Sequence, residues 1–258
     1  LIMGQYVSLK YYFDKELAER LATLISLNYT LFPNEIFIEN ISKRVENKEL
    51  KARVLIIAEE LHAALPKEYD KSLMILLSIL GPINKTEKGM FTNGYFLMPI
   101  ARYVESYGTN HVSLSLEALR EITQRHTSEY AIRPFIVNNT NECLDYFDIW
   151  IKDSSPHVRR LVSEGTRPRL PWAQKIDYIN GDINQNLLLL DSLKNDSSDY
   201  VRKSVGNHLN DLSKEEPDIV LSWILERRTT MPPAVIKRGL RTLVKKEDPR
   251  VLDIINEL

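Results

Sequence analysis

Apolar residues recur along most of the chain at intervals of three and four positions. Val112, Leu116, Leu119 and Ile122 follow this spacing, and several leucine-rich runs repeat it. Such spacing places side chains on one face of an α-helix, whereas a half-buried β-strand needs strict alternation. Alternating runs bounded by Asn-Gly turns are almost absent. The pattern predicts a nearly all-α chain, and because no Pro/Gly-rich linker divides it, we expect one continuous domain over residues 1–258.

Two segments, 153–164 and 196–207, resemble each other at an offset of 43 residues. Both begin with Asp-Ser-Ser; the first continues as PHVRRLVSE and the second as DYVRKSVGN. Weaker echoes occur at 127–133 and 235–238. A period of this length is typical of HEAT-type helix pairs, which stack into a solenoid with the second helices along one concave face. We therefore expect an all-α, HEAT-like helical repeat solenoid (an α-α superhelix). The longer helices that precede the copies are expected at 111–126, 141–152, 183–194 and 217–228.

The charged residues that repeat have a structural explanation. In HEAT-like repeats an aspartate before a helix and an arginine on its first turn often form a ladder between neighbours. Asp153 with Arg159, and Asp196 with Arg202, fit this role. We interpret these four residues as scaffold, so the residues found in only one copy are more informative about function.

The stretch 156–172, PHVRRLVSEGTRPRLPW, concentrates positive charge: it holds four arginines against one acid, Glu164, a local charge of +3. Gly165 and Pro168 predict that a helix ends here and an irregular segment follows. Arginines in such a place can form bidentate pairs with phosphates, and Trp172 could stack on a base or sugar. An equally weighted alternative is that the arginines are solvated and Trp172 fills a gap between repeats.

Three acids are candidates for chemistry. Glu164 lies among arginines, which favour its ionised form. It could form a local salt bridge, or face a cationic substrate group or a water molecule. Glu129 in TSEYAIRPF and Asp211 in VRKSVGNHLND occupy comparable places in neighbouring repeats. The spacing permits all three carboxylates to converge on one concave site.

The amino-acid composition narrows the classes of function that the protein could have. With 34 Lys plus Arg against 35 Asp plus Glu, the net charge is −1, so nucleic-acid binding would need a local basic surface. Cys143 is the single cysteine, which excludes an intramolecular disulfide; we interpret it as a small buried hydrophobe. The five histidines lack metal-ligand spacing, and no glycine-rich phosphate loop occurs, so we expect no metal and no cofactor. No membrane-length apolar run or secretion signal is visible, and we expect a cytoplasmic protein.

Three segments together resemble a known family. SSPHVRRLVSEGTRPRLPWA, TSEYAIRPF and YVRKSVGNHLNDLSKEEPDIV closely resemble the AlkC-type branch of bacterial DNA alkylation repair glycosylases, in the order found in that family. With weaker similarity on both sides, the resemblance covers about residues 5–245. It implies a HEAT-like solenoid that holds double-stranded DNA on a basic face. It also implies excision of N-alkylated bases such as 3-methyladenine, by hydrolysis of the N-glycosidic bond, in base excision repair.

The resemblance assigns roles to particular positions. It implies that Glu129, Glu164 and Asp211 are the carboxylates of the catalytic cleft, with Glu164 and Asp211 favoured for direct chemistry and Glu129 for support. It implies that Trp172 is the aromatic residue near the lesion. The matching basic positions, expected to contact the DNA backbone or the lesion, are Arg160, Arg167 and Arg169.

Further expectations qualify the resemblance. No lysine in the motifs is placed as a Schiff-base nucleophile, so we expect a monofunctional glycosylase. We also expect a monomer that is associated with the nucleoid when it is bound to DNA. Some relatives carry an immunoglobulin-like domain after the helical part, and we expect none here. The segment TTMPPAVIKRGLRTL lacks a tryptophan that many relatives carry. Because non-catalytic relatives exist, the alternative is a HEAT-like DNA-binding or protein-scaffold module.

Overall fold

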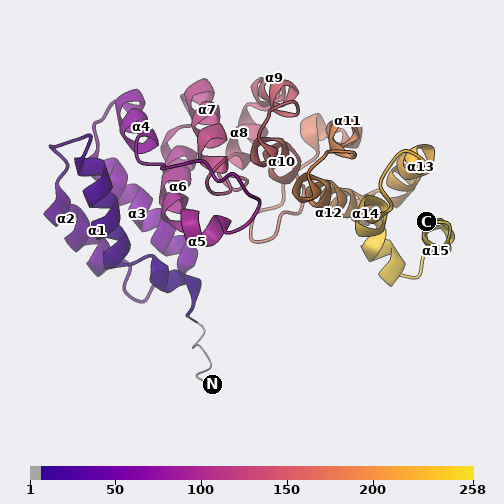
Figure 1. Ribbon diagram of the computed structural model, residues 1–258, viewed down its shortest axis with the longest axis horizontal. Helices are drawn as coiled ribbons and strands as arrows, with labels where there is room; N and C mark the ends of the chain where they lie inside the picture. The colour runs from indigo at the N-terminus through magenta and orange to yellow at the C-terminus, as the bar shows by residue number, and fades with distance from the viewer. Residues whose placement is uncertain (1–6) are drawn as a thin grey trace. The chain divides into compact units, whose positions relative to one another are not determined.

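The structure is helical throughout the part that it describes. The computed structural model describes residues 7–258 (Figure 1). Residues 1–6, where the expected 1–258 domain and the 5–245 resemblance begin, lie outside the described residues. Between residues 7 and 258 there are α-helices and short 3-10 helices and no β-strand, which confirms the all-α class. Contacts group the chain into two compact units, Leu1–Ala131 and Ile132–Leu258, and the single continuous domain stays a prediction.

In the first unit, each helix packs against helices close to it in sequence. Its elements are η1 (Leu9–Tyr12), α1 (Lys15–Ser26), α2 (Asn34–Arg44), α3 (Leu50–Ala64), α4 (Tyr69–Leu77), α5 (Met90–Gly94), η2 (Tyr95–Leu97), α6 (Met98–Tyr107) and α7 (Val112–Thr123). Helix α1 packs on α2, α2 on α3, α3 on α6, and both α4 and α6 on α7. The apolar faces predicted by the spacing are buried: Leu116, Leu119 and Ile122 of α7 have no exposed surface.

The second unit consists of successive helix pairs. Its elements are α8 (Arg133–Asn138), α9 (Thr140–Trp150), α10 (Pro156–Gly165), η3 (Ile179–Gly181), α11 (Ile183–Leu193), α12 (Asp199–Glu215), α13 (Pro217–Arg227), α14 (Pro233–Lys245) and α15 (Pro249–Asn256). Figure 1 shows α9, α11 and α13 along one side of this unit and α10, α12 and α14 along the other. The second helices pack directly on one another, α10 on α12 and α12 on α14. This is the arrangement expected of HEAT-like repeats.

The four longer helices predicted from periodicity are present as α7, α9, α11 and α13, with ends within three residues of the expected ones. The echo at 127–133 differs from the expectation, because it forms turns and α8 begins only at Arg133. Pro134 explains the difference. Its ring and missing N–H restrict proline to the first turn of a helix, so the helix cannot start much earlier.

The repeated Asp and Arg residues form the expected ladder between repeats. Arg159 donates from Nε and Nη2 to the carboxylate of Asp196, at 2.7 and 3.0 Å. Within each copy the arginine also donates to the backbone oxygen of the aspartate six residues before it, Arg159 to Asp153 at 2.8 Å and Arg202 to Asp196 at 2.6 Å. The scaffold interpretation of these four residues is therefore confirmed.

Small residues allow the second helices to approach closely. A Cβ added to Gly206 would lie 2.7 Å from the side chain of Arg238 on α14, and one added to Gly239 would lie 2.9 Å from Cβ of Leu209 on α12. At the α10–α12 crossing the hydroxyls of Ser163 and Ser204 are 2.9 Å apart. Close approach fixes the spacing of the helices that carry Glu164 and Asp211.

A buried polar network joins α10, α11 and α12. His208 is fully buried; its Nδ1 lies 2.9 Å from the backbone oxygen of Ser163 and its Nε2 lies 3.0 Å from Nδ2 of Asn186. The carbonyl can only accept and the amide nitrogen can only donate, so these contacts fit a neutral ring with the proton on Nδ1. Burial lowers the pKa of His208 to about 4, which keeps the ring neutral at physiological pH.

Two further sequence expectations concern the core and the membrane. Cys143 is completely buried in α9, and burial raises the pKa of its thiol to about 12, which confirms its interpretation as a small hydrophobe. Within residues 7–258, no helix combines the length and apolar character needed to cross a bilayer.

The His208 network predicts a pH-dependent stability. The pKa of His208 is lower in the folded protein than in the unfolded chain, so its contribution is complete above about pH 6.5 and is lost as the pH falls towards 4. Gln in place of His208 offers one donor and one acceptor but does not titrate. We expect wild type to lose about 2 to 3 kcal/mol more unfolding free energy than His208→Gln between pH 7 and pH 4.5. Urea unfolding at the two pH values measures this difference, and equal losses would contradict it.

Candidate active site

The helix that carries Glu164 ends where the sequence predicted. Helix α10 ends at Gly165, and the chain continues as turns and irregular backbone through Trp172. A Cβ at Gly165 would lie 2.7 Å from Cγ2 of Ile132, just before α8, so only glycine permits this close approach. The chain then reverses, which brings Arg167 back beside Glu164 and towards α12.

Arg167 joins two of the three predicted carboxylates. Its Nη1 donates to Oε1 of Glu164 at 2.6 Å. Its Nε and Nη2 donate to Oδ2 and Oδ1 of Asp211, at 2.9 and 3.2 Å. Glu164 is 4% exposed and Asp211 2% exposed, and Arg167 is buried as well. Two acids that lie 47 positions apart in the sequence thus share one guanidinium in a largely buried site.

The surrounding charges hold Glu164 in its ionised form. Burial by itself would raise the pKa of Glu164, but the guanidinium groups of Arg160 and Arg167 outweigh it and lower the pKa below its usual value. Nη2 of Arg160 lies 3.2 Å from Oε2 of Glu164, and the same guanidinium lies 4.5 Å from the ring centre of Tyr200. The site therefore presents an ionised carboxylate at neutral pH rather than a protonated acid.

Arg241 on α14 was not singled out by sequence reasoning, although it follows the echo at 235–238. It is half-buried, and its Nη1 donates to the backbone oxygen of Arg238 at 2.8 Å. Burial lowers the pKa of Arg241, and the nearby charges of Arg167 and Arg238 lower it further, whereas Asp211 opposes this. Positive charge thus accumulates beside Asp211.

Arg133 was also missed, although it lies in the quoted motif TSEYAIRPF. Its buried guanidinium donates to four backbone oxygens, one at the end of α10 and three in the segment that follows. The acceptors are Gly165 at 3.0 Å, Arg167 at 2.6 Å, Pro168 at 3.4 Å and Gln174 at 2.8 Å. One side chain therefore fixes the loop that carries both Arg167 and Trp172.

Trp172 lies at the exposed part of this loop. Its side chain is 83% exposed, so the alternative that it fills a gap between repeats is wrong. Its φ of 65° lies in the left-handed region, which is costly for a bulky residue. Arg169, three residues earlier, donates from Nη2 to Glu215 at 2.7 Å. The arginines of 156–172 are therefore engaged in ion pairs rather than merely solvated.

Glu129 belongs to the first unit. It is buried in the turns between α7 and α8, two residues before the boundary with the second unit. The structure thus brings Glu164 and Asp211 together, while convergence of Glu129 with them stays a prediction.

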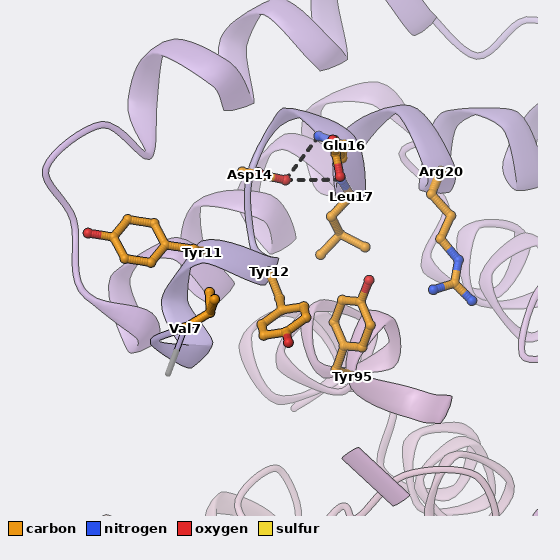
Figure 2. Close-up of a pocket in the computed structure, with 8 residues that line it drawn as sticks. All are labelled: Val7, Tyr11, Tyr12, Asp14, Glu16, Leu17, Arg20 and Tyr95. Atoms are coloured by element: carbon orange, nitrogen blue, oxygen red, sulfur yellow. Dashed lines mark hydrogen bonds between the residues drawn. The ribbon is translucent and has the colours of Figure 1, made fainter. Parts of the chain in front are cut away.

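The candidate site differs from the open pockets of the first unit. Figure 2 shows one of them, which is lined by Tyr11, Tyr12, Tyr95 and Arg20 among others. Its volume is about 430 Å³. Another, of about 460 Å³, is lined partly by His62 and Tyr107, whose rings stack 3.8 Å apart. Neither contains a residue predicted for the site. Within residues 7–258, no group of three or more His, Cys, Asp or Glu side chains is arranged to hold a metal ion.

The chain matches the profile of a known family and a bacterial protein. The profile of the family described as DNA alkylation repair enzyme matches residues 118–243, which include the whole candidate site. The uncharacterized protein YhaZ of Bacillus subtilis (strain 168) is 36% identical over 249 residues, covering 95% of this chain and 67% of YhaZ.

A solved structure is similar over nearly the whole chain. It is the alkylpurine DNA glycosylase AlkC of Pseudomonas fluorescens, bound to DNA containing an abasic site analog. The TM-score is 0.85 with 33% sequence identity, covering 96% of this chain and 68% of that one. The match confirms the helical repeat fold. Together with the family profile and the 36% identity to YhaZ, it shows that the chain belongs to the family of DNA alkylation repair enzymes, in its AlkC-type branch.

Proposed function

We propose that this chain is a DNA glycosylase that hydrolyses the N-glycosidic bond of cationic N-alkylated bases such as 3-methyladenine. The observation that carries the proposal is the buried pair of carboxylates, Glu164 and Asp211, joined by Arg167. The likeness to an alkylpurine DNA glycosylase supports the reaction class. Double-stranded DNA with alkylated bases is the proposed partner, and a cytoplasmic monomer stays our expectation.

The ionisation of the site suits a cationic base. A base alkylated at a ring nitrogen already carries positive charge, so it leaves without being protonated by the enzyme. The nearby arginines keep the pKa of Glu164 low, and buried His208 is neutral, so neither group is a ready proton donor at pH 7. The site is therefore suited to bases that are already charged and poorly suited to neutral bases.

The carboxylates would act on the sugar and on water. As the base departs, positive charge develops on the deoxyribose, and fixed negative groups in a dry site stabilise such charge most effectively. One carboxylate would face the oxocarbenium-like sugar while the other orients or deprotonates the attacking water. Arg167 would hold both carboxylates in place. The proposed reaction needs no protonated acid at this site.

The basic residues near the carboxylate pair would hold DNA. Arg160 and Arg169 are predicted to contact the DNA backbone or the lesion. Arg241 adds positive charge on α14. Exposed Trp172 offers a surface for stacking on a base or sugar. Glu129 is proposed as a supporting carboxylate.

The central experiment measures release of free base from methylated duplex DNA. We expect release of 3-methyladenine, with 7-methylguanine and 3-methylcytosine tested in parallel. Glu164→Gln and Asp211→Asn keep the shape and remove the charge, so each should lower the single-turnover rate about 10²- to 10³-fold.

A matched control separates this loss from an effect of net charge. Glu257 forms an exposed ion pair with Arg228 in the second unit, and Glu257→Gln should keep the wild-type rate. Thermal unfolding of each variant checks that it is folded. No base release by folded wild type, together with salt-sensitive duplex binding, would instead support the non-catalytic binding module.

We also propose that the enzyme is monofunctional and leaves an intact abasic site. Every ion-pair partner described for Glu164 and Asp211 is an arginine, and arginine stays protonated, so it is unsuited to Schiff-base formation. The product strand should break only after treatment with alkali, and borohydride should trap no protein–DNA adduct. A trapped adduct would contradict the assignment.

Trp172 provides a further test. Because its side chain is exposed, Trp172→Ala should leave the unfolding temperature unchanged or slightly raised. Loss of stacking should lower kcat/KM for lesion-containing duplex about 5- to 100-fold, and Trp172→Phe should recover part of it. Equal activity of the Ala and wild-type proteins would remove Trp172 from the proposed site.

A further inference from the structure

Glu215 gathers several donors from the loop that follows α10. Its Oε1 accepts from Arg169, at 3.1 Å from Nε and 2.7 Å from Nη2, and from Nζ of Lys175 at 2.5 Å. Its Oε2 accepts from the hydroxyl of Tyr178 at 3.3 Å. We call these four residues the Glu215 cluster. A single carboxylate thus binds two cations and a hydroxyl in the way that a phosphate oxygen would.

The position of Glu215 is unfavourable for the helix that carries it. It is the last residue of α12, where the backbone carbonyls are unsatisfied and the helix dipole is negative. A carboxylate there is repelled by its own helix. Its place is therefore explained by the loop and not by helix capping. Lys175 first, and then Arg169, lower the pKa of Glu215 to about 2, so the carboxylate is ionised at neutral pH.

The cluster lies on both sides of Trp172 in the sequence. Arg169 precedes Trp172 by three residues and Lys175 follows it by three. The side chains of Arg169 and Lys175 are about half-exposed, at 45% and 55%, while that of Glu215 is 27% exposed. The two cations beside the exposed tryptophan therefore remain accessible to an anion from solvent.

We propose that Glu215 is an internal stand-in for a DNA phosphate, which weakens binding to undamaged duplex by occupying Arg169 and Lys175. The inference rests on the proposed function, because it requires that this loop meets DNA. A DNA phosphate must compete with Glu215 for the same donors. The phosphate therefore gains less binding free energy than it would gain from an arginine and a lysine that had no carboxylate partner. At a lesion, contacts with the proposed site add to binding, whereas undamaged DNA lacks them and is released. Glu215 is thus a positioning residue that acts through Arg169 and Lys175.

The variant Glu215→Gln tests this directly. It keeps the size of the side chain and removes the charge. We expect affinity for a short undamaged duplex to rise about three- to tenfold, because two exposed ion pairs no longer compete. The slope of log affinity against log salt should become steeper by about one to two. Fluorescence anisotropy between about 50 and 200 mM salt measures both quantities.

A competition assay supplies a readout that a purely structural role would not move. With excess undamaged duplex present, base release by Glu215→Gln, taken relative to its own rate without competitor, should fall several-fold more than the corresponding ratio for wild type. Glu215→Asp keeps the charge and should retain the wild-type salt slope. Glu257→Gln makes the same change of net charge at the distant pair with Arg228 and should leave affinity within about twofold.

The outcomes separate this inference from the proposed function. If wild type neither binds duplex nor releases base, the proposed function fails. If wild type is active but Glu215→Gln binds undamaged DNA no more tightly, with an unchanged salt slope, the inference about Glu215 is wrong. Weaker binding by Glu215→Gln would likewise overturn it, since Glu215 would then serve only to order the loop.

Discussion

The guanidinium of Arg167 uses three nitrogens to bridge Glu164 on α10 and Asp211 on α12. Two buried carboxylates repel one another, and burying an ionised group without a partner is costly. The shared arginine compensates this repulsion, and it ties the end of α10 to the C-terminal part of α12. Because both carboxylates depend on the same guanidinium, a change in any one of the three residues alters the pairing of the others, and they are best regarded as one unit whose geometry the surrounding scaffold must preserve.

The scaffold preserves that geometry through contacts between distant segments. The Asp196–Arg159 pair and the close Gly206–Arg238 and Gly239–Leu209 approaches set the positions of the second helices. Arg133 then fixes the backbone from which Arg167 projects, by satisfying carbonyls that would otherwise be buried without donors. A rigid support of this kind suits the proposed role of the carboxylates, which requires fixed charges.

Much of this structure could be predicted from the sequence because it depends on local pattern. Helices α7, α9, α11 and α13 follow from apolar spacing, and the end of α10 follows from Gly165 and the prolines after it. Glu164 and Arg167 are three residues apart at the end of a helix, so their pairing can be predicted from the motif. The roles of Arg133 and Glu215 could not be predicted, because their partners lie 32 to 46 positions away. For Arg133 the partners are also backbone oxygens, which leave no signature in residue identity.

The backbone at Trp172 has a consequence for how this protein changes under selection. A left-handed conformation costs a tryptophan on the order of 1 kcal/mol, whereas glycine or asparagine adopts it with little strain. Exposed as it is, the indole ring returns almost none of that cost through burial. Selection for thermostability alone would therefore replace Trp172, and only selection for an activity that uses the ring would retain it. At Trp172, folding and the proposed activity therefore favour different side chains.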